Sequence, residues 1–250
     1  MNRFWVLMLA ASLAVSGCAH QRMNSENQTG ATKSAPESSV AANRPEALDR
    51  LNDSAKVLDE LMATPDNAIP EYVLEKAECV MIVPSMIKGG FVIGGRHGRG
   101  AVTCRENGRW TAPAFVTISG GSWGAQIGAE VVDLVLVFTN EDSVQALLKN
   151  NFKLGAEASV AAGPVGRQAA AATDATIKAG ILSYSRTRGL FAGLELSGAN
   201  VREDEDSMKG LYGRDMNLNR VLEGQVRPPA GTQEFLTTVR KHFREAQASR

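Results

Sequence analysis

The sequence contains few residues that could build a metal or redox site. Its three histidines, His20, His97 and His242, lie far apart among 250 residues. No cluster of His, Cys and Asp has the short spacing that zinc ligands require. The glycine-rich segment 94–100 lacks the G-x-x-x-x-G-K-[ST] pattern of a phosphate loop, and no helix is expected after it. The sequence therefore predicts neither a metal nor a cofactor.

The chain also lacks an excess of either charge. It carries 27 basic and 27 acidic side chains, so its overall charge gives no attraction to nucleic acid. Aromatic residues make up only 6% of the chain, whereas there are 24 glycines. Abundant glycine favours tight turns and close backbone approach, which is typical of a compact sheet protein.

No apolar run is long enough to cross a bilayer as a helix, which needs roughly 20 residues. The longest, at residues 4–15, follows Arg3 and precedes the small residues Ser16 and Gly17, as in a secretory signal. Residues 15–18, Val-Ser-Gly-Cys, resemble a bacterial lipobox. They predict a signal peptide at residues 1–17, cleavage before Cys18 and acylation of its thiol. The alternative is an ordinary secretory signal that happens to contain a cysteine.

The residue after the predicted lipidated cysteine bears on which membrane the protein reaches. Ala19, rather than Asp, follows Cys18, which by resemblance to sorted lipoproteins favours the periplasmic face of the outer membrane. Residues 18–45 are rich in Ser, Asn, Gln, Ala and Thr, a composition that buries too little apolar surface to fold. We expect the lipidated cysteine to be followed by a flexible tether, and residues 46–250 to form a single domain.

The pattern of that domain predicts the α+β class. Apolar residues recur with helical spacing over residues 46–62, with Pro45 near the helix start, and short helices are expected at 70–77 and 141–149. A final helix is expected at 232–246. Strands are expected at 79–83, 90–93, 101–105, 114–118, 131–138, 156–161, 181–186 and 190–197. Asn107-Gly108 predicts a two-residue hairpin turn. We expect an antiparallel sheet, able to close into a barrel, with flanking N- and C-terminal helices.

Beyond Cys18, only Cys79 and Cys104 remain. In an oxidising compartment they could form a disulfide. Two separately buried thiols are the alternative.

One motif suggests catalysis. Gly120-Gly121-Ser122-Trp123-Gly124 matches G-x-S-x-G, the nucleophile elbow of hydrolases. The elbow requires a strand before it, a helix after it and a histidine downstream. Only His242 follows, in the expected terminal helix, so we interpret the segment as a glycine-rich turn between strands and expect no enzyme.

Basic residues gather beside glycines. Between Met86 and Trp110 there are five basic residues against the single acid Glu106, and three more arginines lie beside later glycines. We expect hairpin ends to bring these residues together as a basic rim that contacts anionic head groups. Within 94–100, the alternative is a hairpin with two solvated arginines. The candidate residues are Lys88, Arg96, Arg99, Arg109, Arg167, Arg186 and Arg188.

Two acidic segments contrast with this rim. Residues 46–78 carry nine acids against three basic residues, which argues against docking that segment on an anionic bilayer. Residues 203–206, Glu-Asp-Glu-Asp, are expected to form a solvated loop.

Several stretches taken together resemble the SYLF domain. They occur in order over about residues 48–225, and each alone is only a glycine-containing turn. They are specific as a set, which includes Lys88-Gly89-Gly90-Phe91, Gly98-Arg99-Gly100, Gly108-Arg109-Trp110, Gly121-Ser122-Trp123-Gly124, Gly163-Pro164-Val165-Gly166-Arg167, Tyr184-Ser185-Arg186 and Gly189-Leu190-Phe191-Ala192-Gly193. The resemblance implies binding of phosphoinositides or other acidic lipids, no catalysis and, in fungal members, actin binding.

The leading hypothesis is therefore a non-enzymatic, lipid-binding envelope lipoprotein. Its expected partners are anionic head groups and the membrane that holds the acylated Cys18. We do not expect actin as a partner in the periplasm. The alternatives are a structural or protein-interaction module of the envelope, and a serine hydrolase that uses Ser122.

Overall fold

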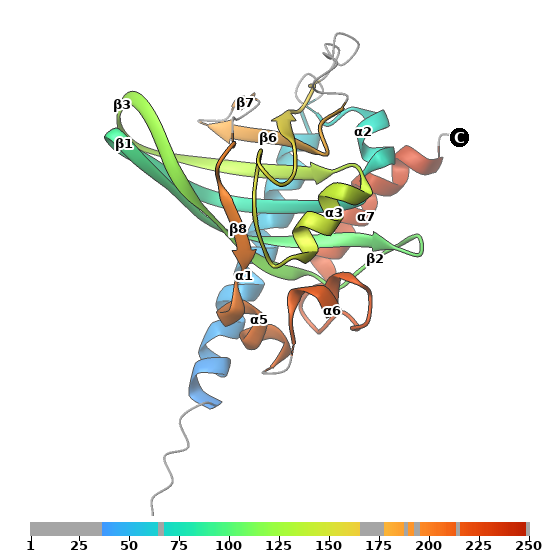
Figure 1. Cartoon of the computed structure of the whole chain (residues 1–250). Coiled ribbons are helices and arrows are strands. Elements are labelled where there is room, and N and C mark those ends of the chain that lie inside the picture. Colours follow the sequence, from blue (N-terminus) through green and yellow to red (C-terminus); the bar gives the residue numbers. More distant parts are fainter. Residues whose placement is uncertain are drawn as a thin grey trace, which may run out of the picture. The chain divides into compact units, whose positions relative to one another are not determined.

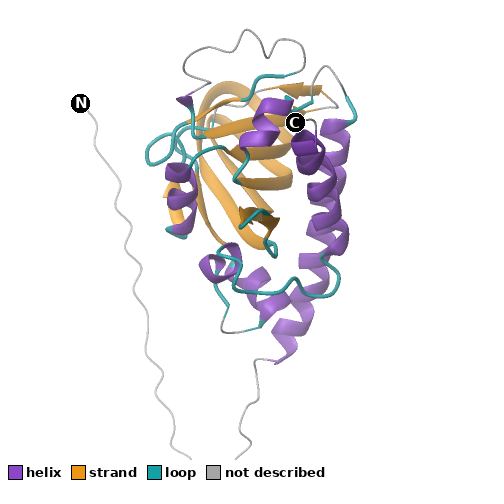
Figure 2. Cartoon of the chain, turned by 90° about the vertical axis from the view of Figure 1, so that its right-hand side faces the viewer, coloured by secondary structure: helices purple, strands orange, loops and turns teal. Residues whose placement is uncertain are grey.

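The computed structural model describes residues 37–64, 68–165, 178–187, 190–192, 196–213 and 216–248, and Ala35–Arg250 form one compact unit (Figures 1 and 2). The helices are α1 (Glu37–Met62), α2 (Glu71–Lys76), α3 (Glu141–Leu148), α5 (Glu205–Tyr212), α6 (Leu218–Leu222) and α7 (Gln233–Ala248). The strands are β1 (Cys79–Glu106), β2 (Arg109–Trp110), β3 (Ala114–Phe138), β4 (Asn151–Lys153), β5 (Val160–Ala162), β6 (Ile181–Thr187), β7 (Leu190–Ala192) and β8 (Asn200–Glu203).

Two long antiparallel strands form the centre of the unit. β1 and β3 pair from Cys79 opposite Phe138 to Val102 opposite Ala114. The register shifts between Gly90 and Val92, where β3 contains extra residues. Such a bulge bends a strand, and Figure 1 shows both strands turning sharply near the labels β1 and β3. We call residues 87–96 of β1, with residues 120–131 that face them on β3, the bend.

Glycine allows the two halves of β1 to pack against each other. A Cβ atom on Gly100 would lie 2.4 Å from the Ile82 carbonyl oxygen, and one on Gly98 would lie 2.6 Å from Val83 Cγ1. Beyond them, the Arg105 N–H donates to the Glu78 carbonyl oxygen at 2.6 Å. The end of β1 therefore returns to its beginning, which curls the sheet.

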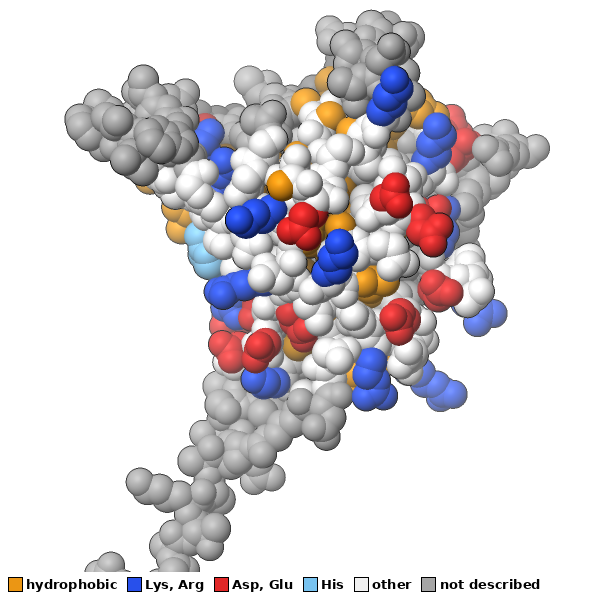
Figure 3. Space-filling view, viewed as in Figure 1, with side chains coloured by type: hydrophobic (Ala, Val, Ile, Leu, Met, Phe, Trp, Pro, Cys, Tyr) orange, Lys and Arg blue, Asp and Glu red, His pale blue; other side chains and the backbone are white. Residues whose placement is uncertain are grey.

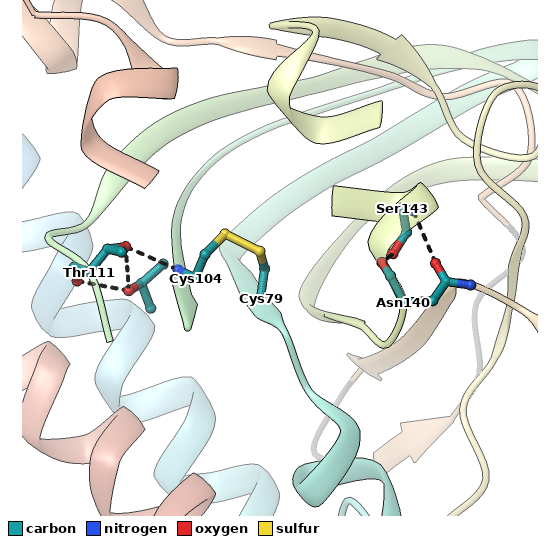
Figure 4. Close-up of a disulfide and its surroundings, with 6 residues drawn as sticks. Cys79, Cys104, Thr111, Asn140 and Ser143 are labelled. Atoms are coloured by element: carbon teal, nitrogen blue, oxygen red, sulfur yellow. Dashed lines mark hydrogen bonds between the residues drawn. A yellow bond between two sulfur atoms is a disulfide. The ribbon is translucent and has the colours of Figure 1, made fainter. Parts of the chain in front are cut away.

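A disulfide joins the two ends of β1, on the side of the curl away from the bend (Figure 4). The sulfur atoms of Cys79 and Cys104 are 2.02 Å apart, and both residues are buried. Thr111 holds the adjoining backbone, because its hydroxyl accepts from the Cys104 N–H at 3.2 Å. Thr103 Oγ1 donates in turn to the Thr111 carbonyl oxygen at 2.9 Å.

The shorter strands extend this sheet. β6 pairs with residues 133–138 of β3, and β8 pairs with residues 116–119 of the same strand. β7 lies antiparallel to β6, whereas β5 lies parallel to it. β4 pairs with β8. The sheet is thus largely antiparallel and curled, and with the N- and C-terminal helices it confirms the predicted α+β class.

The helices bury apolar faces against the sheet and against each other. On α1, Leu51, Leu58 and Leu61 are completely buried, and Figure 2 shows this long helix running along one side of the strands. On α7, Phe235 and Phe243 are also completely buried. Val239, midway between them, is buried as well, and this spacing of four residues is the helical period that predicted the element.

The local predictions for the turns and helices vary in their success. The turn at Asn107 and Gly108 is confirmed, since both residues have positive φ. So is the helix at 141–148, where Asn140 Oδ1 accepts from the Ser143 N–H at 3.0 Å and caps the first turn (Figure 4). The predicted strand at 156–161 is largely wrong, because Gly155 starts a turn and β5 begins only at Val160.

The predicted start of the first helix is wrong. α1 begins at Glu37, so Pro45 lies inside the helix and the expected end of the tether falls within it. A proline there removes one hydrogen bond of the helix. Tertiary contacts compensate, because the Arg44 guanidinium donates to the carbonyl oxygens of Leu211 at 3.2 Å and Ala230 at 3.0 Å.

The predicted division of the first sheet segments is also wrong. The segments expected at 79–83, 90–93 and 101–105 belong to one strand, β1. Gly94 to Gly100 therefore form continuous strand, not a hairpin, and Arg96 and Arg99 do not flank a turn. The glycines permit close packing here and do not interrupt the strand.

Candidate functional site

The structure describes five of the seven basic candidates. These are Lys88, Arg96, Arg99, Arg109 and Arg186. Arg167 and Arg188 lie outside the described residues, as does Cys18.

Arg99 is an ion-pair partner and not an outward-reaching cation. Its Nε and Nη2 atoms donate to the two carboxylate oxygens of Asp204 at 2.8 and 3.2 Å. Nη2 also donates to Ser207 Oγ at 3.1 Å, and Nη1 pairs with Glu46 on α1. Asp204 is almost completely buried and caps the start of α5. The prediction of a solvated loop at 203–206 is therefore wrong at Asp204.

Sequence reasoning missed a second arginine in this cluster. Arg50 of α1, only 8% exposed, donates to Ser207 Oγ at 2.6 Å and lies 3.3 Å from an Asp204 oxygen. Its guanidinium carbon is 5.6 Å from the centre of the Phe115 ring. We call Glu46, Arg50, Arg99, Asp204 and Ser207 the Asp204 network. The sequence signal for it was Asp204 with Ser207 three residues later, which is a helix-capping pattern.

The charges in the Asp204 network perturb one another. Burial acts to raise the pKa of Asp204, but hydrogen bonds from Arg99 and Ser207 outweigh it and lower that pKa below its ordinary value. Burial, and then the positive charge of Arg99, lower the pKa of Arg50. The Asp204 carboxylate is thus the anion that allows two guanidinium groups to lie together.

Arg186 is paired in the same manner at another place. It donates to Asp133 Oδ2 through Nε at 3.0 Å and Nη2 at 2.6 Å, and it pairs with Glu60 of α1. The other oxygen of Asp133 accepts from the Ser85 N–H at 2.9 Å. Ser85 has a positive φ of 53°, so Asp133 also holds an irregular point of β1.

Helix α1 therefore supplies an exposed carboxylate to each of two expected rim arginines. Glu46 and Glu60 are about four helical turns apart, about 21 Å along the axis. The acids of α1 are thus not simply solvated, and two of them neutralise Arg99 and Arg186. These two arginines hold the fold together, which leaves them poorly suited to bind a head group.

The other candidates do not meet at one place. Lys88 is opposite Glu130 in the bend and forms no ion pair within 4 Å among the described residues. Arg96 Nη2 donates to the Gly121 carbonyl oxygen at 3.2 Å. Arg109 is exposed on β2, at the far end of the sheet from the bend. In Figure 3 basic and acidic side chains are interspersed, without one continuous basic region on that face.

Apolar side chains are exposed at one edge of the bend. Ile87 and Val131 are cross-strand partners, with exposed fractions of 57% and 59%. Their neighbours Met86 and Val132 point inward and are buried. The continuous apolar run at 131–138 predicted a strand there, but no strand was predicted at Ile87, and the sequence does not show that these two outer positions remain uncovered.

The nucleophile-elbow motif has the wrong surroundings for a hydrolase. Gly120 to Gly124 lie within continuous strand β3, with no helix after them, and the side chain of Ser122 lies outside the described residues. His242, the downstream histidine, pairs with Asp59 at 2.6 Å and so links α7 to α1. Burial acts to raise the pKa of Asp59, but hydrogen bonds from His242 and Lys241 lower it overall.

Among the described residues no group of His, Cys, Asp and Glu could hold a metal ion. Within the same part of the chain, no helix is long and apolar enough to cross a membrane.

Residues that carry the SYLF resemblance have clear packing roles. A Cβ atom on Gly163 would lie 2.3 Å from Cζ of the buried Tyr184, so the ring requires glycine there. Gly100 permits the contact between the two halves of β1. Tyr184 and Arg186 are neighbours on β6, one buried in the core and the other paired with Asp133.

Comparison with known proteins agrees with this reading. Residues 119–242 match the Ysc84 family, described as "Las17-binding protein actin regulator". An SH3 domain-containing protein of Schizosaccharomyces pombe is 40% identical over 166 residues, which cover 65% of this chain and 38% of that protein. LAS seventeen-binding protein 3 of Saccharomyces cerevisiae is 34% identical over 168 residues, covering 66% and 36%.

A vertebrate relative is similar over a longer stretch. SH3 domain-containing YSC84-like protein 1 of Xenopus laevis is 35% identical over 190 residues, which cover 73% of this chain and 56% of that protein. The chain thus spans between about a third and just over half of the length of these relatives. The family description refers to binding and regulation, and the name of the Saccharomyces cerevisiae relative refers to binding. With the family match and the motif residues placed in one fold, the chain belongs to the SYLF family, of which Ysc84 is a member.

Proposed function

We propose that this chain is a non-enzymatic envelope lipoprotein whose SYLF domain docks on anionic lipid head groups through the bend. One observation carries the choice of surface. Lys88 and Arg96 both lie on β1 within the bend, whereas Arg99 and Arg186 are held by carboxylates elsewhere in the fold. Both side chains are half-buried, and a cation near the surface of an anionic bilayer contributes about 1 kcal/mol.

The acidic face of α1 supports the same orientation. Asp49 and Asp53 are exposed on this helix, beside the paired Glu46 and Glu60. A bilayer with negative charge would be repelled by that face. The bend is therefore the better surface to approach the membrane.

Charge reversal in the bend tests this proposal. Lys88→Glu with Arg96→Glu is expected to reduce flotation of residues 19–250 with vesicles of phosphatidylcholine and phosphatidylglycerol at least tenfold, since two attractive charges become repulsive. Wild-type binding should weaken as salt rises. Affinity is measured by flotation at several salt concentrations.

A matched variant controls for net charge. Arg109→Glu with Arg227→Glu makes the same charge change at two exposed positions outside the bend. It should bind nearly as the wild type does. If both double variants lose the same affinity, binding depends on net charge alone, and the bend is not the docking surface.

The anchor is proposed on the sequence of residues 1–19 alone. Acylation of Cys18 would hold the chain at the periplasmic face of the outer membrane, because more than one acyl chain gives stable attachment. Cys18→Ser is expected to abolish incorporation of labelled fatty acid and to leave the chain uncleaved or soluble. Continued labelling and membrane fractionation of this variant would reject the lipoprotein proposal.

A protein-interaction role is the second candidate. It is favoured by the family description, which names a binding partner and a regulatory role. In that case the same surface of the domain would contact an envelope protein, and neither actin nor Las17 is proposed for a chain facing the periplasm. Absence of wild-type flotation with anionic vesicles, even at low salt, would favour this candidate.

A further inference from the structure

The exposed apolar pair in the bend is not explained by head-group attraction. Among the described residues, the large hydrophobic side chains that remain exposed are Tyr72, Ile87 and Val131. Tyr72 is 40% exposed on α2, whereas the other two are more exposed and directly opposite each other on β1 and β3. Two neighbouring side chains of this kind form one small apolar surface.

This surface lies where the covering of the outer sheet face ends. Val135 and Val137 lie on the same face of β3 as Val131, because side chains alternate along a strand. Both are nevertheless completely buried. Between them and Val131 lies Asp133, paired with Arg186. Arg186 also binds Glu60, near the end of α1. Among the described residues, the side chains that cover this face of the sheet therefore end at the cluster of Asp133, Arg186 and Glu60. Ile87 and Val131 are the next pair beyond it.

The chemistry of the neighbouring residues fits a lipid surface. Lys88 follows Ile87 directly and starts from the opposite face of β1, and Arg96 is farther along the same bend. Glu130 faces Lys88 and precedes Val131, so the charges at this edge are mixed. Apolar side chains flanked by cations are typical of elements that lie at the boundary between head groups and acyl chains. The proposed acyl anchor would keep such a surface close to the domain.

We propose that Ile87 and Val131 form an apolar wedge that enters the head-group boundary of an anionic bilayer while Lys88 and Arg96 contact the phosphates. This inference rests on the proposed lipid-binding function and adds a component that salt does not screen. Charge attraction brings the bend to the surface, and burial of the wedge retains it there.

The experiment uses residues 19–250, which retain the whole compact unit Ala35–Arg250. Ile87→Thr with Val131→Thr keeps β-branched side chains and replaces one apolar branch of each with a hydroxyl group. Injected beneath a monolayer of phosphatidylcholine and phosphatidylglycerol, the wild type should raise the surface pressure and the double variant should not. In high salt, the variant should float with vesicles of the same composition roughly tenfold less than the wild type.

Two further variants keep the result interpretable. Tyr72→Gln removes an exposed apolar side chain elsewhere and should insert as the wild type does. Val131→Trp should raise insertion, because tryptophan prefers the bilayer interface. All variants should retain the wild-type melting temperature and mass in light scattering.

The possible outcomes separate this inference from the proposed function. If the wild type floats but the threonine variant inserts equally well, the wedge is rejected and head-group docking stands. If the wild type does not float at low salt, both are rejected. A wild-type dimer that becomes monomeric in the threonine variant would assign the surface to a second copy and overturn the wedge.

Discussion

Replacing Asp204 with asparagine is expected to lower the free energy of unfolding by about 3–5 kcal/mol, the usual cost of removing one partner from a buried ion pair. The carboxylate is the buried anion between Arg50 and Arg99. Without it, Arg50 would remain almost completely buried beside a second positive charge. Denaturant unfolding at neutral pH measures the change.

A neighbouring acid provides the control. Asp49→Asn makes the same chemical change at an exposed position on α1 and should alter stability by less than about 0.5 kcal/mol. Equal stabilities of the Asp204 and Asp49 variants would show that the Asp204 network contributes nothing to folding. Such a result would also make Arg99 a candidate again for contact with lipid head groups.

The effect should depend on pH in a defined direction. The folded protein holds the pKa of Asp204 below its ordinary value of 3.8, through hydrogen bonds from Arg99 and Ser207 that outweigh burial. Its contribution is therefore present above about pH 4, where the unfolded chain is also ionised, and is lost as the pH falls through the folded pKa. The difference between wild type and Asp204→Asn should shrink below pH 4. A difference that grows there would contradict the assignment.

Removing the disulfide should have the second large effect. Cys79→Ala with Cys104→Ala is expected to cost about 3–4 kcal/mol in the free energy of unfolding, from the loop-closure entropy of two cysteines 25 positions apart in the sequence. The physical basis is that the bond joins the two ends of β1, which otherwise meet through hydrogen bonds and packing alone. Denaturant unfolding with and without reductant measures it.

The thiol chemistry supplies an independent check. Unreduced wild type should offer no thiol from Cys79 or Cys104 to alkylating reagents, even when denatured, and reduction should bring its stability to that of the double alanine variant. Two free thiols per chain in denatured, unreduced protein taken from the periplasm would show that the bond does not form there.

The fold class and most helices could be predicted from sequence because they depend on local patterns. The periodic apolar residues that indicate α7 and the Asn140 cap of α3 act within a few residues of each other. Glycine was the main source of error. Gly98 and Gly100 have the composition of a turn, but their role is to allow contact with Val83 and Ile82 across the curl.

The candidate site could be predicted only in part, because charge partners lie far apart in the chain. Arg99 and Asp204 are separated by 105 residues, and Arg186 and Glu60 by 126. A local count of basic residues singled out Lys88 and Arg96, which both lie on β1. It had no means of showing that α1 would supply carboxylates to Arg99 and Arg186.

The packing of α1 has a consequence for how the chain acquires its fold. Arg44 binds the carbonyl oxygen of Ala230, and Asp59 binds His242, 186 and 183 residues farther along. A chain that emerges into a compartment with its N-terminus first would hold α1 without these partners until nearly all of it had arrived. Contacts of such long range slow folding. Helix α1, the helix nearest the proposed anchor, is therefore the first to enter the compartment and among the last to form its tertiary contacts.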